Sequence, residues 1–415
     1  MNKIGIAIIG TGDRGCFVLG SRILDLALET GFRIEALCDI NPKRLQDSHS
    51  YLSDRARKAE VEFHPRLYTD FKVAIDDPSV SLVMVTNHTY VHRDPAVLAM
   101  DRGKFLYLDK PIAVVLEDAE AILEAQIKNS APVIMGFTRR YESSWKIAFN
   151  ICAQGRIGEL QMILIRSVIP YSRYFQMWHR QSQLSGGALN DKSSHHMDVF
   201  NWMSGSHCVR LTAIGGRSRI FAPDPAAPPY CAVCDRDCPY RREASISEHP
   251  EGSHVLGYES WSKADLIIDR ADTCVYLPGA DIDDHAIVTL EYANGIKASL
   301  FWTIFGPPAQ DQETLELIGS SGRVLLTRST GQIELISRFG KDREIIDART
   351  ENFGSSHYGA DIELVRELRH FVDGKTPTVS VLEGVRALDM ILAAKRSIDS
   401  GGQVQVLPMR YSGEH

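Results

Sequence analysis

The chain has 415 residues, an ordinary globular composition with 44% hydrophobic and 24% charged residues, and a formal net charge of −7. This length exceeds what one hydrophobic core usually organises, so we expect two domains. The charge provides no basic surface for nucleic acid or an anionic membrane, and no apolar run is long enough to span a membrane, so neither partner is expected.

The first predicted strand, residues 4–9, is followed directly by a G-x-G-x-x-G turn. The turn consists of Gly10, Thr11, Gly12, Asp13, Arg14 and Gly15. In a nucleotide-binding fold these glycines allow a tight turn, close approach of a pyrophosphate and close packing of the next helix. Free N–H groups at the start of that helix would face the phosphates. The alternative is an ordinary structural turn.

A second predicted strand, residues 33–38, ends at Asp39. This is where a nucleotide-binding fold places an acid that hydrogen-bonds the adenosine ribose. A carboxylate there would repel a 2′-phosphate, so NAD is predicted rather than NADP, although Lys43 and Arg44 nearby weaken the preference. Alternatively, Asp39 and the Asn41-Pro42 pair simply begin the next helix.

Short apolar runs continue to alternate with helical patterns through the first third of the chain. Further strands are predicted at 82–85, 105–108 and 133–136, and helices at 42–58, 95–102 and 116–128. Parallel strands with crossover helices form a doubly wound sheet, whose ligand crevice lies at the carboxyl ends of the strands. Gly10, Asp39, Thr86 and Asp109 should gather in that crevice.

The strand predicted at 105–108 ends in Asp109-Lys110-Pro111, at the mouth of the crevice. A lysine at this position can hydrogen-bond and polarise a substrate hydroxyl. The alternative is a solvated lysine at a strand end, and the pattern alone does not separate the two.

A second polar cluster follows Gly186-Gly187. Asp191, His195 and Asp198 are spaced by four and three residues, so they would line one face of a helix. A histidine between two carboxylates can act as a proton acceptor. A lone histidine is more often structural, and the two acids beside a glycine turn favour a catalytic role.

Beyond about residue 141, alternating strands joined by turns indicate a broad, mainly antiparallel sheet. Strands are predicted at 286–292 and 296–304, which form a hairpin around Asn294-Gly295, and at 313–318, 323–327 and 332–336, before helices at 361–373 and 381–400. Apolar residues on both faces of such a sheet need cover from helices on one side and from another subunit on the other. Oligomerisation of the chain is therefore expected.

Eight cysteines fall into two groups. Cys16, Cys38, Cys152 and Cys208 are isolated in apolar segments and are interpreted as buried apolar residues. Cys231, Cys234, Cys238 and Cys274 lie in a proline- and charge-rich insertion at about 222–275. These four could bind a structural zinc ion, with His249 and His254 as competitors for the fourth position. Metal-free thiols, an iron–sulfur cluster and a disulfide are the alternatives.

Taken together, these motifs resemble the Gfo/Idh/MocA family of oxidoreductases, named after glucose-fructose oxidoreductase and inositol dehydrogenase, over nearly the whole chain. The resemblance rests on residues 10–15, 109–111, 136–141 and 186–198, and the cysteine insertion is similar to that of a bacterial subgroup. It implies a Rossmann dinucleotide-binding domain over 1–137. It also implies a substrate-binding and oligomerisation domain over 138–415. This second domain would be an α/β domain with a large open, mainly antiparallel sheet.

The resemblance further implies an NAD-dependent oxidoreductase that transfers a hydride between nicotinamide and a secondary hydroxyl of a sugar, polyol or sugar derivative. His195 would be the base, Lys110 its electrostatic partner, and Asp191 would help to position the alcohol. The implied cofactor-binding residues are Gly10, Thr11, Gly12, Asp13, Arg14, Gly15, Asp39, Thr86, Asn87, His92, Asp109 and Lys110. The implied substrate-binding residues are Lys110, Arg140, Tyr141, Arg173, Trp178, Asp191, Lys192 and His195.

The sequence departs from the family pattern in three places. Asp109 replaces a glutamate, Ser193 replaces a glycine, and the segment 85–88 lacks a proline, so that His92 fills the family's histidine position with a slip of one residue. These departures bear on the substrate more than on the cofactor.

Two other functions are compatible with parts of this pattern. A redox-neutral glycosidase would use bound NAD for transient C3 oxidation and elimination, and would take a further acid–base group from Tyr141, Tyr171, His179 or His196. The basic, aromatic stretch 166–180 could then reach an anionic sugar substituent, unless it is a surface loop with scattered charges. A non-catalytic NAD sensor need not keep Lys110, Asp191 and His195 together, so their joint presence argues against it.

The expected partners are a small-molecule carbohydrate and further copies of the chain. Residues 1–3 lead directly into an apolar strand and leave no room for a signal peptide. The expected location is therefore the cytoplasm.

Overall fold

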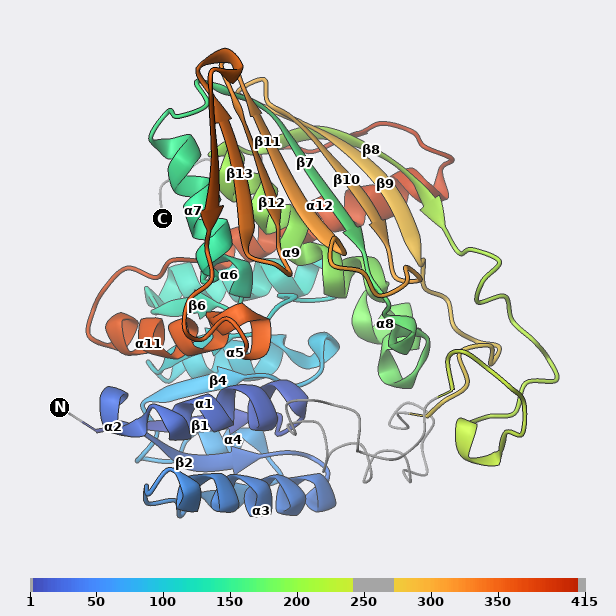
Figure 1. Ribbon diagram of the computed structural model, residues 1–415. Coiled ribbons are helices and arrows are strands. Elements are labelled where there is room, and N and C mark those ends of the chain that lie inside the picture. Colours follow the sequence, from blue (N-terminus) through green and yellow to red (C-terminus); the bar gives the residue numbers. More distant parts are fainter. Residues whose placement is uncertain (1–2, 242–271, 410–415) are drawn as a thin grey trace.

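The structure is a computed structural model that describes residues 3–241 and 272–409. It contains two sheets, which lie one above the other in Figure 1, with the N-terminal sheet at the bottom. Helices pack against each sheet and between them, so the two parts share an extended junction.

The N-terminal sheet is six-stranded, parallel and doubly wound, as predicted. Its strands are β1 (Ile4–Ile9), β2 (Phe32–Cys38), β3 (Arg66–Tyr68), β4 (Leu82–Val85), β5 (Phe105–Leu108) and β6 (Val133–Met135). Their order is β3-β2-β1-β4-β5-β6, which is that of dinucleotide-binding folds. The central strands are apolar throughout because both faces are covered. β3 was not predicted, since this edge strand is short and largely exposed.

The helices of this domain are α1 (Ser21–Asp25), α2 (Ala27–Thr30), α3 (Pro42–Lys58), α4 (Phe71–Ile75), α5 (Arg93–Asp101) and α6 (Leu116–Asn129). The three predicted ones, α3, α5 and α6, begin and end close to the predicted residues, whereas the short helices α1, α2 and α4 were not predicted. A π-helical segment, Asp13–Gly20, precedes α1. At the start of α3, Asn41 Oδ1 accepts hydrogen bonds from the N–H groups of Lys43 and Arg44. The cap is therefore Asn41, whose own N–H donates to Asp39 Oδ1 at 2.9 Å.

The second sheet has nine strands in the order β14-β13-β12-β11-β7-β10-β9-β8-β15. They are β7 (Leu160–Val168), β8 (Cys208–Gly216), β9 (His285–Tyr292), β10 (Lys297–Thr303), β11 (Glu313–Gly319), β12 (Arg323–Thr327), β13 (Gln332–Ser337), β14 (Asp342–Asp347) and β15 (Gln405–Val406). The pairing is antiparallel except between β7 and β10. The predicted hairpin is confirmed, with Leu290 opposite Ala298. β14 was not predicted because most of its residues are exposed and give no apolar pattern.

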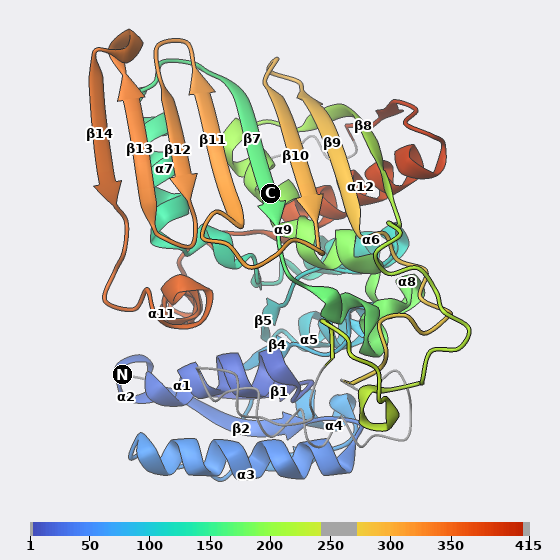
Figure 2. The same ribbon diagram turned by 45° about the vertical axis from the view of Figure 1, so that its right-hand side comes forward.

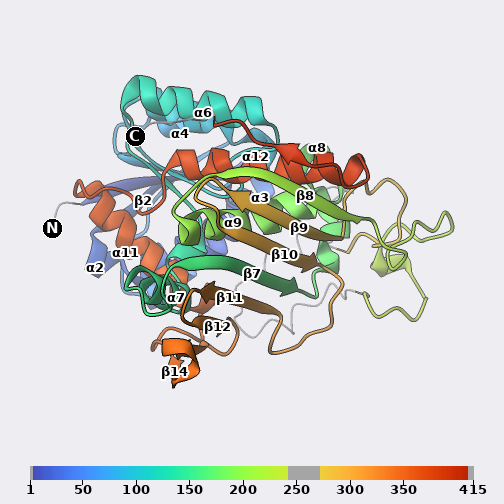
Figure 3. The same cartoon turned by 90° about the horizontal axis from the view of Figure 1, so that it is seen from above.

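Within the described part of the chain, helices cover one face of this sheet. The helices α7 (Ser143–Ala153), α9 (Gly187–Ser204) and α12 (Val381–Asp399) pack against its strands, and Figure 3 shows α12 lying along the sheet. Residues such as Ile163 and Leu300 on that face are fully buried. Alternate residues point the other way, and Phe301 is 48% exposed. Among residues 3–241 and 272–409, this second face, which we call the bare face, therefore keeps apolar side chains exposed.

The C-terminal helices join the two sheets. α12 packs on both α9 and α6, while α11 (Ala360–Val372) packs against α1. The rings of Phe105 in β5 and Phe371 in α11 meet edge to face at 5.5 Å. In Figure 2, α8 (Ser182–Ser185) and α9 lie between the sheets. A division of the sequence near residue 137 thus separates two sheets whose covering helices are shared.

Candidate active site

The three glycines of the loop after β1 occupy different surroundings. Gly10 has φ +93°, and a Cβ there would lie 2.5 Å from the backbone of Asn87. A Cβ on Gly15 would lie 2.1 Å from the Gly10 oxygen, whereas one on Gly12 would meet nothing within 4 Å. Gly12 also precedes the segment Asp13–Gly20, whose first N–H groups have no intrahelical partner. The loop thus offers an open cradle at a helix N-terminus, which fits a pyrophosphate.

Asp39 lies against this loop at the end of β2. Its Oδ2 accepts hydrogen bonds from the backbone N–H of Thr11 at 3.1 Å and from the Thr11 hydroxyl at 3.3 Å. The Arg44 guanidinium approaches Oδ1 at 3.4 Å. A buried carboxylate beside the glycine loop is well placed for ribose hydroxyls, and Arg44 partly balances its charge.

The segment after β4 closes the other side of the loop. The Thr86 hydroxyl donates to the Gly10 oxygen at 2.9 Å, and the ring of His92 lies 3.0 Å from the Asn87 carbonyl oxygen. Burial lowers the pKa of His92, so the ring is neutral. Asn87 Oδ1 is buried without a partner among the described residues. Thr86 and His92 therefore shape the loop, while Asn87 keeps an acceptor for an incoming donor.

Arg14 and Asp109 contact each other. Asp109 Oδ1 accepts from Arg14 Nε at 3.3 Å and from the Tyr107 hydroxyl at 2.8 Å. Arg14 also binds Asp361 of α11, with Nη1 2.5 Å from the carboxylate. These two predicted cofactor residues thus anchor the glycine loop to β5 and to the C-terminal helix, a role that the motif gave no sign of.

Lys110 and Asp191 meet, as predicted, across the junction of the two domains. Lys110 Nζ lies 2.8 Å from the backbone oxygen of Asp191 and 3.3 Å from its Oδ1. The hydroxyl of Tyr174 donates to Asp191 Oδ2. Burial alone would raise the pKa of Asp191, but Lys110, His179 and the Tyr174 hydroxyl hold it well below its usual range. Asp191 is therefore a carboxylate that fixes Lys110.

His195 lies one turn further along α9. It is 4% exposed, its ring meets Phe137 edge to face at 5.8 Å, and Nδ1 has no hydrogen-bond partner among the described residues. Burial, together with the positive charges of Arg139 and Lys110, holds the pKa of His195 well below its usual value. The imidazole is therefore neutral and able to accept a proton.

Asp198 does not flank His195 as the spacing predicted. It is fully buried and accepts a two-pronged hydrogen bond from Arg140, with Nη2 2.7 Å from Oδ1 and Nε 3.0 Å from Oδ2. A guanidinium donates two parallel hydrogen bonds to a carboxylate, so Asp198 binds Arg140 more strongly than it would bind the imidazole of His195. Arg140 also stacks on Trp202, and Tyr141 beside it is buried. The contacts of Arg140 are thus those of a structural ion pair.

Trp178 links the two domains at the crevice. Its ring lies 4.7 Å from the ring of His88, in the segment after β4, and 4.1 Å from that of His179. Burial lowers the pKa of His179 to about 4. Arg173, nearby in sequence, places its guanidinium 4.7 Å from the centre of the Tyr171 ring. An aromatic wall with a cation beside it therefore borders the Lys110–Asp191 pair.

A buried ion cluster next to His195 was not predicted. Glu313 of β11 accepts from Arg139, from Arg328 at 3.2 Å and from His196 at 3.1 Å, and Arg328 also binds Glu142 at 2.6 Å. The partners are far apart in sequence and show no spacing signal. Only the fold brings them together, under the segment that carries Lys192 and His195.

The four clustered cysteines line one cavity. The two segments that carry them run side by side, since Cys231 N–H donates to the Asp272 oxygen at 2.8 Å and Cys274 N–H to the Pro229 oxygen at 3.0 Å. Across residues 3–241 and 272–409, no group of three or more His, Cys, Asp or Glu side chains has the arrangement of a metal site. The predicted competitors His249 and His254 lie outside the described residues.

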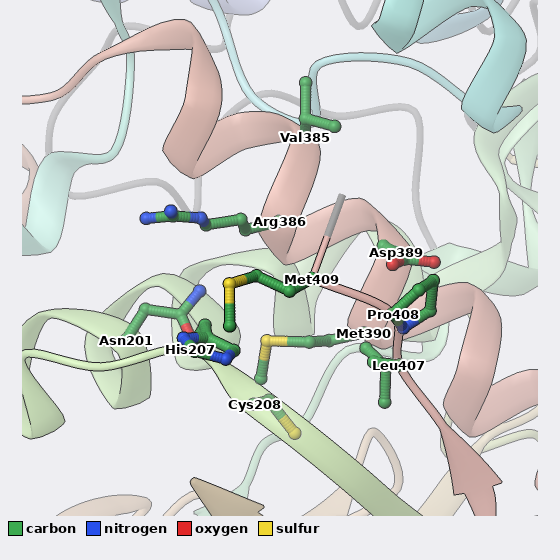
Figure 4. A pocket seen from close by; sticks show the side chains of 10 residues that line it. All are labelled: Asn201, His207, Cys208, Val385, Arg386, Asp389, Met390, Leu407, Pro408 and Met409. Atoms are coloured by element: carbon green, nitrogen blue, oxygen red, sulfur yellow. The ribbon is translucent and has the colours of Figure 1, made fainter. Parts of the chain in front are cut away.

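A separate pocket lies at the other end of α9 (Figure 4). Asn201 and Cys208 border it on one side and α12 on the other, with Met409 of the C-terminal segment across it. Ten residues of helix, about 15 Å, separate Asn201 from Asp191, so this pocket is distinct from the candidate site.

Comparison with known families identifies the class of protein. Residues 4–137 match the profile described as oxidoreductase family, NAD-binding Rossmann fold, and residues 151–406 match that described as oxidoreductase family, C-terminal alpha/beta domain. The chain therefore belongs to the Gfo/Idh/MocA family of oxidoreductases, and the predicted family, fold and NAD-binding domain are confirmed.

Individual relatives are distant. The putative oxidoreductase YteT of Bacillus subtilis is 25% identical over 71% of this chain and 70% of its own length. Inositol 2-dehydrogenase of Salmonella typhimurium is 28% identical over 48% of this chain and 54% of its own length. Among solved structures, levoglucosan dehydrogenase in complex with NADH and levoglucosan superposes with a TM-score of 0.74 at 15% identity, covering 98% of this chain and 100% of the other.

Within the described ranges, the structure has no helix long and apolar enough to cross a membrane.

Proposed function

We propose that this chain is an NAD-dependent dehydrogenase that transfers a hydride between nicotinamide and a secondary hydroxyl of a sugar, polyol or sugar derivative. One observation carries the proposal: Lys110 contacts Asp191 across the junction of the two domains, and a buried, neutral His195 lies one helical turn further along α9, where it feels the charge of Lys110. The names of two relatives, inositol 2-dehydrogenase and levoglucosan dehydrogenase, support a polyol or sugar substrate.

The residues around the glycine loop fit NAD. The open cradle at Gly12 would hold the pyrophosphate, and Asp39 would accept the ribose hydroxyls. When bound, NAD supplies the hydride acceptor, which no amino-acid side chain can provide. Asp39 favours NAD over NADP because a 2′-phosphate would bring negative charge next to a carboxylate already held by Thr11.

The side chains divide the remaining work. Neutral His195 accepts the proton of the substrate hydroxyl. The Lys110 ammonium donates a hydrogen bond to the same oxygen and stabilises the negative charge that develops on it. Asp191, held by Tyr174, fixes the position of Lys110 and so keeps the hydroxyl aligned.

The decisive experiment is a panel of sugars, polyols and glycosides assayed with NAD and with NADP. We expect NADH formation with at least one free sugar or polyol and weaker use of NADP. Lys110→Ala and His195→Ala should each lower kcat/KM by about 100-fold or more, whereas exposed Lys128→Ala and His370→Ala should not. Full activity in both site variants would contradict the assignment.

A redox-neutral glycosidase is a second candidate, and one feature supports it. Such an enzyme needs a further acid–base group, and the ring of Tyr171 lies 6.1 Å from that of Tyr174 and next to two cations. The positive charge of Lys192 lowers the pKa of Tyr171 to about 8, although burial alone would raise it. In the same panel, release of an aglycone without accumulation of NADH would identify this activity.

Two further proposals concern assembly and metal. The bare face of the nine-stranded sheet would pair with another copy of the chain, giving a homodimer or homotetramer.

The four cysteines that share a cavity would rotate their side chains to bind one structural zinc ion.

A further inference from the structure

Lys192 stands out among the charged residues around the candidate site. It lies on α9 between Asp191 and His195, and its side chain is only 9% exposed. Its ammonium lies 5.0 Å from the centre of the Tyr171 ring. Among the residues that the structure describes, none forms a hydrogen bond or ion pair with Nζ, which nevertheless keeps contact with solvent-accessible space.

The neighbouring charges are already matched. Arg139 and Arg328 are neutralised by Glu313 and Glu142 in the buried ion cluster. Lys110 is matched by Asp191 in the same way. Among the described residues, the charge of Lys192 therefore has no counter-ion. A buried charge without a counter-ion destabilises the folded protein unless a ligand compensates it.

Two tyrosines connect the Lys192 charge with the Lys110–Asp191 pair, where the reacting hydroxyl would bind. The Tyr174 hydroxyl binds Asp191, and the Tyr171 ring lies 6.1 Å from the Tyr174 ring, with Lys192 on Tyr171. The two tyrosines thus link the ammonium to the Lys110–Asp191 pair, and the charges of Lys110 and Lys192 both act on His195. Arg173 adds a second cation at the same ring.

We propose that Lys192 binds an anionic group of the substrate, a carboxylate or a phosphate, so that the site takes anionic sugars in preference to neutral ones. This inference rests on the proposed function, and it defines the substrate class of that site. A bound anion would receive charge-assisted hydrogen bonds from Nζ while the sugar hydroxyl meets Lys110.

The pH dependence of the preference follows from the same pair. Burial lowers the pKa of Lys192 to about 8, and the pKa of Tyr171 is also lowered to about 8. The other charged groups that act on the pair are Arg139, Arg173, Arg328 and Glu313. Whichever member loses its proton, the net charge of the pair falls from +1 to 0. The preference for anions should therefore fade as the pH rises through about 8.

The test compares hexuronates, hexoses and hexose 6-phosphates of the same sugar configuration, with saturating NAD. We expect kcat/KM to favour an anionic sugar by about tenfold or more in the wild-type enzyme, the worth of a charge-assisted hydrogen bond. Lys192→Met should remove that preference by lowering kcat/KM for the anionic sugar more than for the hexose, while Lys192→Arg should keep it. Preference for the uronate or for the phosphate tells which anion is bound.

Lys128→Met is the control, because the Lys128 side chain in α6 is 76% exposed. It should change kcat/KM for neither the anionic nor the neutral sugars. Equal use of anionic and neutral sugars by the wild-type enzyme, or an equal loss for both in Lys192→Met, would overturn the inference. If Lys192→Met does not fold, the wild-type pH profile decides, since a preference unchanged up to pH 9.5, well above the pKa near 8, contradicts it.

Failure of the proposed function has a separate signature. If no sugar is oxidised, hexuronate and hexose are titrated against the NADH-loaded protein and binding is followed directly. Tighter binding of the hexuronate that is lost in Lys192→Met still supports the inference. Equal affinity for the hexuronate and the hexose contradicts the inference.

Discussion

At the scale of single residues, each glycine of the motif is needed for a different reason. Gly10 is required by its positive φ and by the Asn87 backbone, and Gly15 by the Gly10 oxygen. Gly12 is unlike both, since no atom of the described residues lies within 4 Å of a side chain placed there. Its space is free for a ligand, so its role should show in binding and not in folding.

Two substitutions separate these roles. Gly12→Ala should leave the melting temperature nearly unchanged but weaken NAD binding by about tenfold or more, because a methyl group enters the cradle. Gly15→Ala should destabilise the fold by about 2 kcal/mol, since overpacking forces the backbone apart. Thermal unfolding and a calorimetric NAD titration measure both. Normal NAD affinity in a folded Gly12→Ala variant would refute the cradle.

At the scale of elements, helix α9 shows what a spacing pattern does and does not determine. Asp191 contacts Lys110, and His195 lies one turn further along the helix, where Lys110 lowers its pKa, in keeping with their separation of four residues. Asp198, three residues on, is held by Arg140 from the segment after β6. The pattern placed these side chains on a helix, but the partner of each was set by the element packed opposite.

The cysteine insertion gives the prediction at this scale. Elemental analysis of the purified protein should find one zinc ion per chain, and Cys234→Ser should lose it together with some thermal stability. Cys152→Ser, which changes a cysteine of α7, should retain the metal. Protein without metal, in which all four clustered thiols react with a thiol reagent, would exclude the zinc site.

For the whole molecule, the arrangement of two sheets has two consequences. The candidate active-site side chains come from the end of β5 and from α9, and α12 ties the two parts together by packing on both α9 and α6. The nine-stranded sheet uses its inner face for this packing and leaves apolar residues on the outer one. Single monomers seldom expose a broad apolar surface, so the outer face is suited to self-association.

Phe301→Glu on the bare face should therefore dissociate the protein. We expect the wild-type chain to be a dimer or tetramer by light scattering after size-exclusion chromatography, and the variant to shift towards the monomer, since a buried aromatic contact is often worth about 2 kcal/mol or more. Phe339→Glu is the control, because Phe339 is 83% exposed in the turn between β13 and β14. A monomeric wild-type protein would rule out the proposed assembly.

The sequence by itself determined the class of fold, the NAD-binding loop and the pair of segments that carry Lys110 and His195. These features depend on local pattern: a buried strand next to a glycine turn, a strand end, and a helical spacing. Tertiary structure alone decided that Arg140 pairs with Asp198, that Arg14 ties the loop to Asp361, and that Lys192 has no counter-ion among the residues that the structure describes. Partners in an ion pair are chosen by distance and burial in space, and for residues up to 347 positions apart no sequence pattern records that choice.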